Sequence, residues 1–446
     1  MRQTGQDLTE GSLWKKILLF SIPLIVSNIL QVLFNMADVA VVGRFAGPMA
    51  LGEVGSTTSL VALFTGVLIG VAGGINVLVA LYYGAQNETE TRETVHTSAI
   101  ISLLIGLGLL LLGGGFARVI LQLLHTKPEL IEGAVLYLRI YFLGMPALAL
   151  YNYGNAVFSA TGNTQKPLFY LMLAGIVNVI LNLIFVIGCG MDVEGVAVAS
   201  IISQYLSAVL IIRALFRSGE SYGLHRKYLR ITKDKAKAVL GLGIPSGMQN
   251  GIFQLANLFI QTGVNSFSAT MVAGNAAAAN ADGLVYDGMA AFYTACGSFI
   301  GQNYGAGKTD RVKKSYLVSL AYSFFVGTAA GLLFVAFGPR FLSLFTTEQA
   351  VVEAGMKRLT IMGLSYGVSA FMDCTIAASR GLGKSIVPTI VVIMGSCVFR
   401  IVWIYTVFAH FRTIESLYLL YIFSWSITAI AEIWYFRRVY IKTLRR

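Results

Sequence analysis

The sequence predicts an all-α polytopic membrane protein with twelve transmembrane helices in two pseudo-symmetric six-helix lobes. Of its 446 residues, 56% are hydrophobic and only 12% are charged, and the mean hydropathy is +0.72. Soluble domains carry about 25% charged residues, so this chain has too few polar side chains to cover a surface that faces water. The nearly continuous apolar runs, such as Leu103–Leu112 and Ile176–Ile187, exclude a transmembrane barrel, whose strands alternate at every second residue.

An internal repeat divides the chain into two halves. Prolines and glycines that shape the backbone recur 221 or 222 positions later: Pro23 as Pro245, Gly162 as Gly383 and Pro167 as Pro388. A repeat of half the chain length indicates two homologous lobes, with a functional site between or within them. Pro23 and Pro245 fall inside apolar helices, where a proline removes a backbone hydrogen bond and bends the helix.

Each helix is placed by an apolar run bounded by polar or glycine-rich turns. The predicted first lobe, residues 1–217, contains helices at 15–42, 51–83, 96–124, 131–159, 167–190 and 193–217. The predicted second lobe, residues 238–446, contains helices at 238–266, 279–303, 315–344, 351–379, 386–409 and 414–438. The longest polar stretch lies between them, and its residues 218–237 form the predicted cytoplasmic linker.

The net charge of +12 does not indicate nucleic-acid binding, because the basic residues cluster in short connections. Most of the 33 lysines and arginines fall on the side of the N-terminus, which the positive-inside rule makes the cytoplasmic side. An even number of spans then puts both termini in the cytoplasm of a multi-pass protein of the plasma (inner) membrane. Attraction to anionic lipid headgroups accounts for the excess positive charge.

Few acids lie within the predicted spans, and each is a candidate functional residue because an ionised carboxylate in the hydrocarbon layer costs several kcal/mol. They are Asp38, Asp282, Asp287, Asp373 and Glu432. Two amides, Asn178 and Asn182, are four residues apart and share one helix face.

Asp38, Asn178 and Asn182 have no counterparts in the second half, where the repeat places Ile260, Phe399 and Trp403. One carboxylate and two amide oxygens make a pocket suited to Na⁺, or to H⁺ carried by Asp38. The alternative is a hydrogen-bonded cluster that only clamps two helices together. From the residues alone the two interpretations are equally favoured.

Four local motifs resemble the multidrug and toxic-compound extrusion (MATE) family. They are Asn35-Met36-Ala37-Asp38, the segment Asn178–Asn182, Gly301-Gln302-Asn303 and Arg380-Gly381. The resemblance covers essentially the whole chain. It implies two six-helix bundles that form a V around a central cavity, and efflux of amphipathic, often cationic, compounds driven by inward Na⁺ or H⁺ flow.

The same resemblance implies a cation site at Asp38, Asn178 and Asn182, with Ser200 as the matching hydroxyl of the sixth helix. The second lobe departs from the family pattern, because the stretch Asn250–Gln254 has no acid and Asp373 is only seven residues before Arg380. We therefore expect coupling to depend on the first lobe alone.

The remaining acids and several aromatic residues are candidates for the substrate cavity: Asp373, Asp282, Asp287, Tyr151 and Tyr286. Aromatic faces attract cations, although aromatic residues are also ordinary packing residues in membrane helices. Arg400 is the basic residue that we expect to neutralise one of these acids, with an Asp373–Arg400 ion pair favoured. Glu432 is expected to meet Arg213 or solvent near the end of the last helix.

Taken together, these features predict a secondary antiporter that exports amphipathic, cationic drugs or metabolites. It needs no cofactor other than a coupling ion, Na⁺ or H⁺. The expected partners are a small molecule and membrane lipid, not nucleic acid, and the expected state is a monomer. One alternative is a flippase for lipid-linked precursors, which would have extra spans and a strongly basic cavity. Another is an intramembrane enzyme, but no nucleophile–base arrangement or histidine cluster is present to support it.

Overall fold

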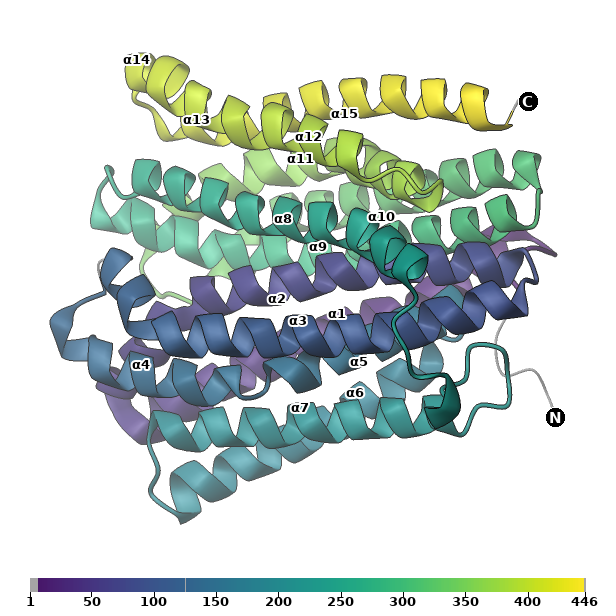
Figure 1. The fold of residues 1–446 in the computed structure, drawn as a ribbon. Helices are drawn as coiled ribbons and strands as arrows, with labels where there is room; N and C mark the ends of the chain where they lie inside the picture. Colours follow the sequence, from purple (N-terminus) through teal and green to yellow (C-terminus); the bar gives the residue numbers. More distant parts are fainter. Residues whose placement is uncertain (1–6, 125, 445–446) are drawn as a thin grey trace. The chain divides into compact units, whose positions relative to one another are not determined.

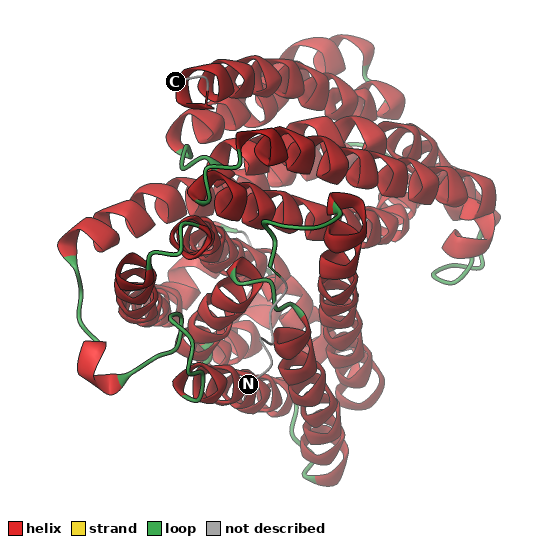
Figure 2. Ribbon diagram, turned by 90° about the vertical axis from the view of Figure 1, so that its right-hand side faces the viewer, coloured by secondary structure: helices red, strands yellow, loops and turns green. Residues whose placement is uncertain are grey.

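The computed structural model describes residues 7–124 and 126–444, and every regular element in these ranges is a helix (Figures 1 and 2). The first half contains α1 (Leu13–Val41), the π-helical η1 (Val42–Ala46), α2 (Gly47–Gly84), α3 (Glu88–Leu123), α4 (Pro128–Phe142), α5 (Met145–Ala160), α6 (Gln165–Asn182), the π-helical η2 (Leu183–Gly188) and α7 (Val193–Phe216). A short 3₁₀ helix, η3 (Arg226–Tyr228), lies in the connection between the halves. The second half contains α8 (Lys233–Val264), α9 (Ala269–Gly305), α10 (Thr309–Leu342), α11 (Gln349–Gly381), α12 (Ile386–Val392), the π-helical η4 (Ile393–Val398), α13 (Phe399–Trp403), the π-helical η5 (Ile404–Phe408), α14 (Ala409–Phe411) and α15 (Ile414–Leu444).

These elements form twelve spans once the consecutive pieces α4–α5, α6–η2 and α12–α14 are each counted as one, which confirms the predicted fold class. By length and composition, eight helical segments of the described chain are apolar enough to cross a membrane, or nine with the α4–α5 pair. This number is below twelve because Leu13–Gly84, which contains both α1 and α2, counts once, and because α8 and α9 are less apolar. The predicted helix at 131–159 is in fact this pair, bent by 47° at its break. The bend follows from Gly144 at the N-cap of α5 and from Pro146 in its first turn, because proline is tolerated at a helix start and not in its interior.

The internal repeat is also visible in the helix irregularities. The π-helical segment η2 begins at Leu183, and η5 begins 221 positions later at Ile404. π-Helical turns are rare inserts in α-helices, so two of them at the repeat distance indicate that η2 and η5 occupy equivalent positions of the repeat. The two halves therefore share this one π-helical insert, whereas η1 and η4 have no counterpart at the repeat distance in the described chain.

The described chain divides into two compact units, and two helices contribute to both. The N-terminal unit contains Val26–Gly247, whereas the C-terminal unit contains Leu8–Ile25 and the chain from Met248 onward. The first half of α1 therefore packs with the C-terminal helices, and the first half of α8 packs with the N-terminal helices. Both transitions come shortly after the internal prolines, Pro23 and Pro245. The lobe boundaries at 217 and 238 stay a prediction.

In the N-terminal unit, glycines bring α2 and the start of α8 into close contact. A Cβ atom on Gly74 would lie 2.7 Å from the backbone nitrogen of Gly243, and one on Gly70 would lie 2.4 Å from that of Gly247. On each helix the two glycines are four residues apart, Gly70 and Gly74 on α2 and Gly243 and Gly247 on α8. This spacing lets membrane helices approach through their backbones.

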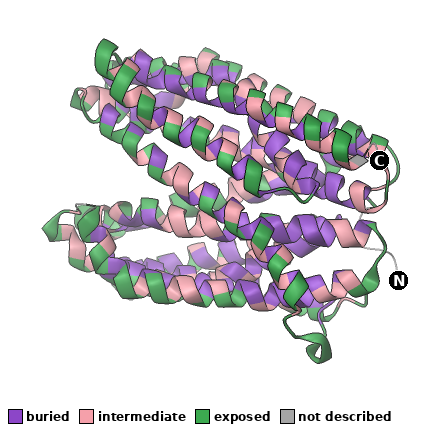
Figure 3. Ribbon diagram, turned by 45° about the horizontal axis from the view of Figure 1, so that its top comes forward, coloured by how far each residue is buried: buried purple, intermediate pink, exposed green. Residues whose placement is uncertain are grey.

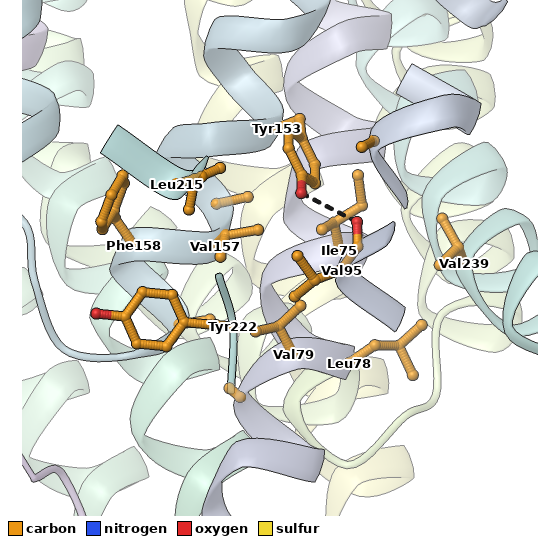
Figure 4. Close-up of a cluster of buried hydrophobic side chains, with 14 of the residues drawn as sticks. Ile75, Leu78, Val79, Val95, Tyr153, Val157, Phe158, Leu215, Tyr222 and Val239 are labelled. Atoms are coloured by element: carbon orange, nitrogen blue, oxygen red, sulfur yellow. Dashed lines mark hydrogen bonds between the residues drawn. The ribbon is translucent and has the colours of Figure 1, made fainter. Parts of the chain in front are cut away.

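One of the buried clusters of the N-terminal unit includes side chains of α2, α3, α5 and α7 (Figure 4). Ile75 and Val79 of α2 meet Val157 of α5, and the Tyr153 hydroxyl donates a hydrogen bond of 3.0 Å to the Val95 carbonyl oxygen. A buried tyrosine hydroxyl needs such a partner, so the bond allows the ring to fill the core.

Other helix faces carry exposed apolar side chains, which Figure 3 shows as green segments next to buried purple ones. Leu111 is 72% exposed and Ile430 is 70% exposed, each on a long apolar helix. Such residues suit contact with lipid hydrocarbon, since lipid tails are as apolar as leucine.

Candidate functional site

The structure brings four of the predicted site residues together in the N-terminal unit. Asp38 lies near the end of α1, Asn178 and Asn182 lie on α6, and Ser200 lies on α7. The Asn182 side-chain nitrogen donates a hydrogen bond directly to Asp38 Oδ1, and Ser200 Oγ donates to Asp38 Oδ2 over 3.4 Å. The same Asn182 nitrogen lies 3.4 Å from Asn178 Oδ1. Both carboxylate oxygens of Asp38 are thus held by neutral donors.

Local sequence explains how α1 and α6 come this close. Gly175 lies one turn before Asn178, and a Cβ atom there would lie 1.8 Å from the Phe34 ring of α1. The absence of a side chain at Gly175 therefore makes room for Phe34, which is one turn before Asp38. The α-helical part of α6 ends at Asn182, and the π-helical η2 follows at once. π-Helical inserts in helices frequently accompany functional sites.

The electrostatics of this cluster are unusual for a buried acid. Asp38 is half-buried, whereas Asn178 and Asn182 are 5% and 0% exposed. Within the described residues, no lysine, arginine or histidine forms an ion pair with Asp38. In addition, Asn182 Oδ1 is buried and accepts no hydrogen bond from any described group. The cluster therefore combines a negative charge without a counter-charge and a buried oxygen without a donor.

This donor set fits an alkali cation or a proton better than a transition metal. Its side-chain oxygens come from a carboxylate, two amides and a hydroxyl, which are ligands that hard cations prefer. Among the described residues, no group of three or more His, Cys, Asp or Glu side chains is placed to hold a metal ion. For Na⁺ to use Asn182 Oδ1 at Asp38, the amide has to turn, because its nitrogen faces the carboxylate here.

Two aromatic residues that the sequence did not single out are influenced electrostatically by this carboxylate. Tyr137 and Tyr141 of α4 are stacked with 5.8 Å between ring centroids, and both are within electrostatic range of Asp38. They are four residues apart on one helix, so their shared face was visible in the sequence. Their proximity to α1 was not, because it depends on the packing of α4.

The residues of the C-terminal unit that are equivalent by the repeat to Asp38, Asn178 and Asn182 are apolar. Two of them pack against other apolar side chains. Ile260 is buried in the C-terminal core, and Trp403 stacks on Phe423 with 5.1 Å between ring centroids. The Trp403 indole nitrogen donates a hydrogen bond of 2.8 Å to the Ser416 carbonyl oxygen. Tight aromatic packing therefore replaces the polar cluster in the second half.

The C-terminal unit contains a different buried network, centred on Arg358 of α11. Arg358 forms an ion pair with Asp282 of α9, and its Nη1 donates a 2.9 Å hydrogen bond to Asn275 Oδ1. The hydroxyls of Tyr366 and Tyr418 donate to Asp282 and Asn275, respectively. The partner of Asp282 is thus Arg358, which the sequence analysis did not consider, and not Arg400.

Asp373 and Arg400 do not meet in an ion pair within the described chain. The buried Arg400 instead donates to Ser424 Oγ over 3.2 Å and lies 4.7 Å from the centre of the Tyr421 ring. Neutral hydrogen bonds and an aromatic face stabilise this guanidinium, which removes its need for a direct carboxylate partner.

The structure places the other candidates as follows. Asp287 is half-buried on α9. Tyr151 is buried in the N-terminal core, where its hydroxyl donates to the Pro167 carbonyl oxygen, so it packs a core. Tyr286 lies edge-on to Tyr366, with 5.9 Å between ring centroids, and so borders the Asp282 network.

Glu432 corrects one expectation. It is 0% exposed, so the predicted contact with solvent is wrong, and the charged group that acts on it electrostatically is Arg380 of α11. The helix α15 continues beyond the predicted end at 438 to Leu444, which places Glu432 well inside the helix.

Comparison with known proteins gives one family and a consistent set of relatives. The family model MatE matches residues 23–184 and 245–406, two copies separated by 222 positions. The chain is 26% identical over 395 residues to the probable multidrug resistance protein YoeA of Bacillus subtilis, covering 86% of this chain and 85% of that protein. It is 23% identical over 391 residues to the probable multidrug resistance protein NorM of Thermotoga maritima, covering 84% and 82%.

Among solved structures, the chain is similar to a MOP superfamily transporter from Pyrococcus furiosus with a TM-score of 0.92. The match covers 100% of this chain and 99% of the other at 21% sequence identity. That structure is described as having a binding pocket of reversed polarity, which suggests a different function for it. At this level of identity the likeness concerns the fold alone.

Proposed function

We propose, since the chain belongs to the multidrug and toxic-compound extrusion family of transporters, that it is a cation-coupled secondary antiporter. It exports amphipathic, cationic drugs or metabolites against inward movement of Na⁺ or H⁺. The protein is a multi-pass membrane transporter and not an enzyme. The coupling ion, the charge of the substrate and the orientation of the transporter in the membrane are proposed.

The observation that supports coupling is the state of Asp38. Its carboxylate is held by Asn182 and Ser200, faces no basic partner among the described residues and lies beside the unpaired oxygen of Asn182. A purely structural clamp between α1 and α6 would need no negative charge, and an amide at position 38 would serve it as well. A negative charge without a counter-ion instead creates affinity for a cation.

Coupling requires that the cation binds one conformation of the transporter more tightly than the other. The site spans α1, α6 and α7, so cation binding changes what holds these three helices together. When a cation occupies the site, Asp38 no longer needs both hydrogen-bond donors, and the Asn182 amide is released to turn its oxygen toward the ion. Cation binding thereby alters the packing of α1, which provides the differential affinity.

A cationic substrate is supported by the charges of the C-terminal unit. Asp373 is a half-buried acid that forms no ion pair with a described basic residue, whereas Asp282 is neutralised by Arg358. Export of several chemically different compounds is supported by the names of the relatives in Bacillus subtilis and Thermotoga maritima. The concentration of basic residues in the connections on the N-terminal side supports cytoplasmic termini in the plasma (inner) membrane.

The test uses purified full-length protein in lipid vesicles with Na⁺ and pH gradients imposed separately. Efflux of a fluorescent cationic dye, ethidium, should be stimulated by at least one gradient in the wild type. Asp38→Asn should abolish that stimulation while the amount of inserted protein and its thermal stability stay at the wild-type level. Asp310→Asn, which neutralises an exposed acid on α10, is the matched control and should transport normally.

Two outcomes would contradict the proposal. Gradient-driven efflux at the wild-type rate in Asp38→Asn would remove this residue from coupling. Stimulation of the wild type by neither gradient, with dye binding intact, would refute antiport.

A further inference from the structure

The Gly301-Gln302-Asn303 motif, to which the sequence assigned no chemistry, contacts the segment that precedes α1. This segment, Leu8–Ser12, is named the α1 leader below. The Leu8 backbone nitrogen donates a 3.3 Å hydrogen bond to Gln302 Oε1, and Asn303 Nδ2 donates a 3.1 Å bond to the Leu8 carbonyl oxygen. Gln302 and Asn303 are both buried, and Asn303 Nδ2 also donates a 2.7 Å hydrogen bond to the Phe299 carbonyl oxygen of α9, which fixes this amide on its own helix.

Arg311, in the first turn of α10, also binds this segment. Its guanidinium donates to three carbonyl oxygens of the α1 leader: Gly11 at 2.9 Å, Glu10 at 3.1 Å and Leu8 at 3.4 Å. Its Nε also donates to Asn303 Oδ1 over 3.0 Å, which fixes the guanidinium and the amide relative to each other. Charge-assisted bonds of this kind are about twice as strong as neutral ones.

Two further features strengthen this attachment. Lys308 Nζ donates to the Thr9 carbonyl oxygen over 3.0 Å. The Leu8 side chain is fully buried in a cluster with Phe292 and Phe299 of α9, and that cluster continues into α1 through Phe20. Gln302, Asn303, Lys308 and Arg311 together form a polar cradle, named the α1 cradle below, around a main-chain segment with an apolar anchor.

Most of these bonds go to main-chain atoms, so the cradle mainly holds the backbone of the leader. Of the cradle residues, Lys308 also contacts leader side chains, at Thr9 Oγ1 over 3.2 Å and at the exposed Glu10 carboxylate over 3.7 Å. The glycine at position 11 is explained by the backbone conformation there. Gly11 has φ of +71°, a left-handed conformation that glycine adopts without strain, and it turns the leader into α1.

The start of α8 is held in a similar manner in the N-terminal unit by the first turns of α3. The His225 backbone nitrogen donates to His96 Nε2 over 2.9 Å, and the Thr232 backbone nitrogen donates to Thr97 Oγ1 over 3.1 Å. Lys235, in the first turn of α8, forms an ion pair with Glu90 and lies 4.1 Å from the centre of the Tyr82 ring. The Lys235 side chain is buried in this pair, whereas that of Glu90 is 35% exposed.

The internal repeat relates the two attachments. Arg311 lies 221 positions after Glu90, and Asn303 lies 221 positions after Tyr82, which is the repeat distance established from the motifs. Equivalent positions therefore hold the start of a repeat-related helix by different contacts. A guanidinium and an amide bind main-chain oxygens in one unit, whereas a carboxylate and an aromatic ring bind the Lys235 side chain in the other.

We propose that Gln302, Asn303 and Arg311 are positioning residues for transport that bind the main chain of the α1 leader. The corresponding residues at the start of α8 are His96 and Thr97, which bind main-chain nitrogens, and Glu90, which binds the Lys235 side chain. This inference rests on the proposed function, because it assigns these contacts a role in coupling beyond stability. Asp38 lies near the far end of α1. With the leader held on the C-terminal unit, a rearrangement at Asp38 has to be absorbed inside the helix, at Pro23, and is not lost by sliding of the whole helix.

The experiment compares Arg311→Ala with Lys314→Ala in vesicles containing the full-length chain. Lys314 is an exposed basic residue on the same helix, so it controls for loss of charge. Arg311→Ala should lower the maximal rate of gradient-driven dye efflux about tenfold, since it removes several charge-assisted hydrogen bonds. The half-saturating concentrations of cation and dye should remain at wild-type values, because the cation site lies at the other end of α1. Arg311→Lys should recover part of the rate.

A cross-linking variant distinguishes positioning from stability. In Arg311→Ala, Thr9→Cys and Lys308→Cys are joined by a short thiol-specific cross-linker, after the exposed Cys189 has been changed to serine. Re-attaching the leader should restore the maximal rate. Thr9→Ala with Glu10→Ala, which leaves the main chain intact, should transport close to the wild-type rate.

The proposal is overturned if Arg311→Ala inserts and transports like Lys314→Ala, or if cross-linking restores thermal stability without restoring the rate. These outcomes leave the proposed function intact as long as Asp38→Asn still abolishes coupling. A normal rate in both Asp38→Asn and Arg311→Ala would instead refute the antiport mechanism itself.

Discussion

Asp282→Asn should destabilise the protein without altering how it recognises its substrate. In the structure, Asp282 accepts hydrogen bonds from Arg358 Nε, Arg358 Nη2 and the Tyr366 hydroxyl. The asparagine keeps the bond from Tyr366 but leaves the Arg358 guanidinium buried without a counter-charge. Removing one partner of a buried ion pair costs about 3–5 kcal/mol, so the free energy of unfolding should fall by about that amount.

The double variant Asp282→Asn with Arg358→Met should recover much of this loss. It removes both charges, and the methionine fills part of the guanidinium's volume. Replacing a buried ion pair by groups that need no counter-charge is often neutral. The two single changes should therefore be strongly non-additive, with a coupling energy of about 2 kcal/mol or more in a double-mutant cycle.

The assay is denaturant-induced unfolding in detergent micelles, followed by tryptophan fluorescence, together with dye-efflux kinetics in vesicles. Asp282→Asn should unfold at a lower denaturant concentration, while the protein that remains folded has the wild-type KM for the dye. Wild-type stability combined with a raised KM would refute the reasoning, because it would make Asp282 a substrate contact and leave Arg358 with another partner.

Two further predictions concern the N-terminal unit. Gly74→Ala should lower the free energy of unfolding by about 1–3 kcal/mol in the same unfolding assay, because its Cβ would lie 2.7 Å from the Gly243 nitrogen. Gly73→Ala is the control and should be neutral, because a Cβ atom there would have nothing within 4 Å. Equal effects of the two changes would exclude close backbone packing as the cause. Asn182→Leu should raise the half-saturating cation concentration of dye efflux about tenfold or more, because it removes a hydrogen bond to a charged group and an oxygen ligand. An unchanged cation dependence in Asn182→Leu would separate this amide from the cation site.

The fold was predictable because its signals are local and repeated. Apolar runs place the spans, and the recurrence of Pro23, Gly162 and Pro167 at a constant distance gives the two-fold organisation without any tertiary information. The bend between α4 and α5 carried only the local signal of Gly144 and Pro146, which also occur as tolerated irregularities in membrane helices. The exchange of the first halves of α1 and α8 between units could not be predicted from hydropathy, because hydropathy reports how apolar a helix is and not which helices it packs against.

Contacts between side chains that are far apart in sequence were harder to predict, both around Asp38 and around Asp282. Asn178 and Asn182 share a face by helix periodicity, but their contact with Asp38 joins residues 144 positions apart. That grouping came from the repeat asymmetry and from family resemblance. The favoured Asp373–Arg400 ion pair was wrong, and the partner of Asp282 was not predicted, because Arg358 is far from Asp282 in sequence and only the packing of α9 against α11 brings them together. The cradle around the α1 leader was not foreseen, because main-chain recognition by Gln302, Asn303 and Arg311 requires no particular sequence in the leader.

The two units differ in how the charge of an acid within the helices is neutralised. This difference explains how two repeat-related units can contain a cation site in only one of them. In the C-terminal unit the buried charge of Asp282 is neutralised permanently by Arg358, a covalently attached cation that cannot leave. In the N-terminal unit Asp38 has only neutral donors, so its counter-charge has to come from solution and can be exchanged. Exchange of a mobile cation can perform work only where no resident one competes with it. A basic residue introduced beside Asp38, such as Ser200→Lys, should therefore imitate the C-terminal solution and lock the transporter in its cation-bound conformation.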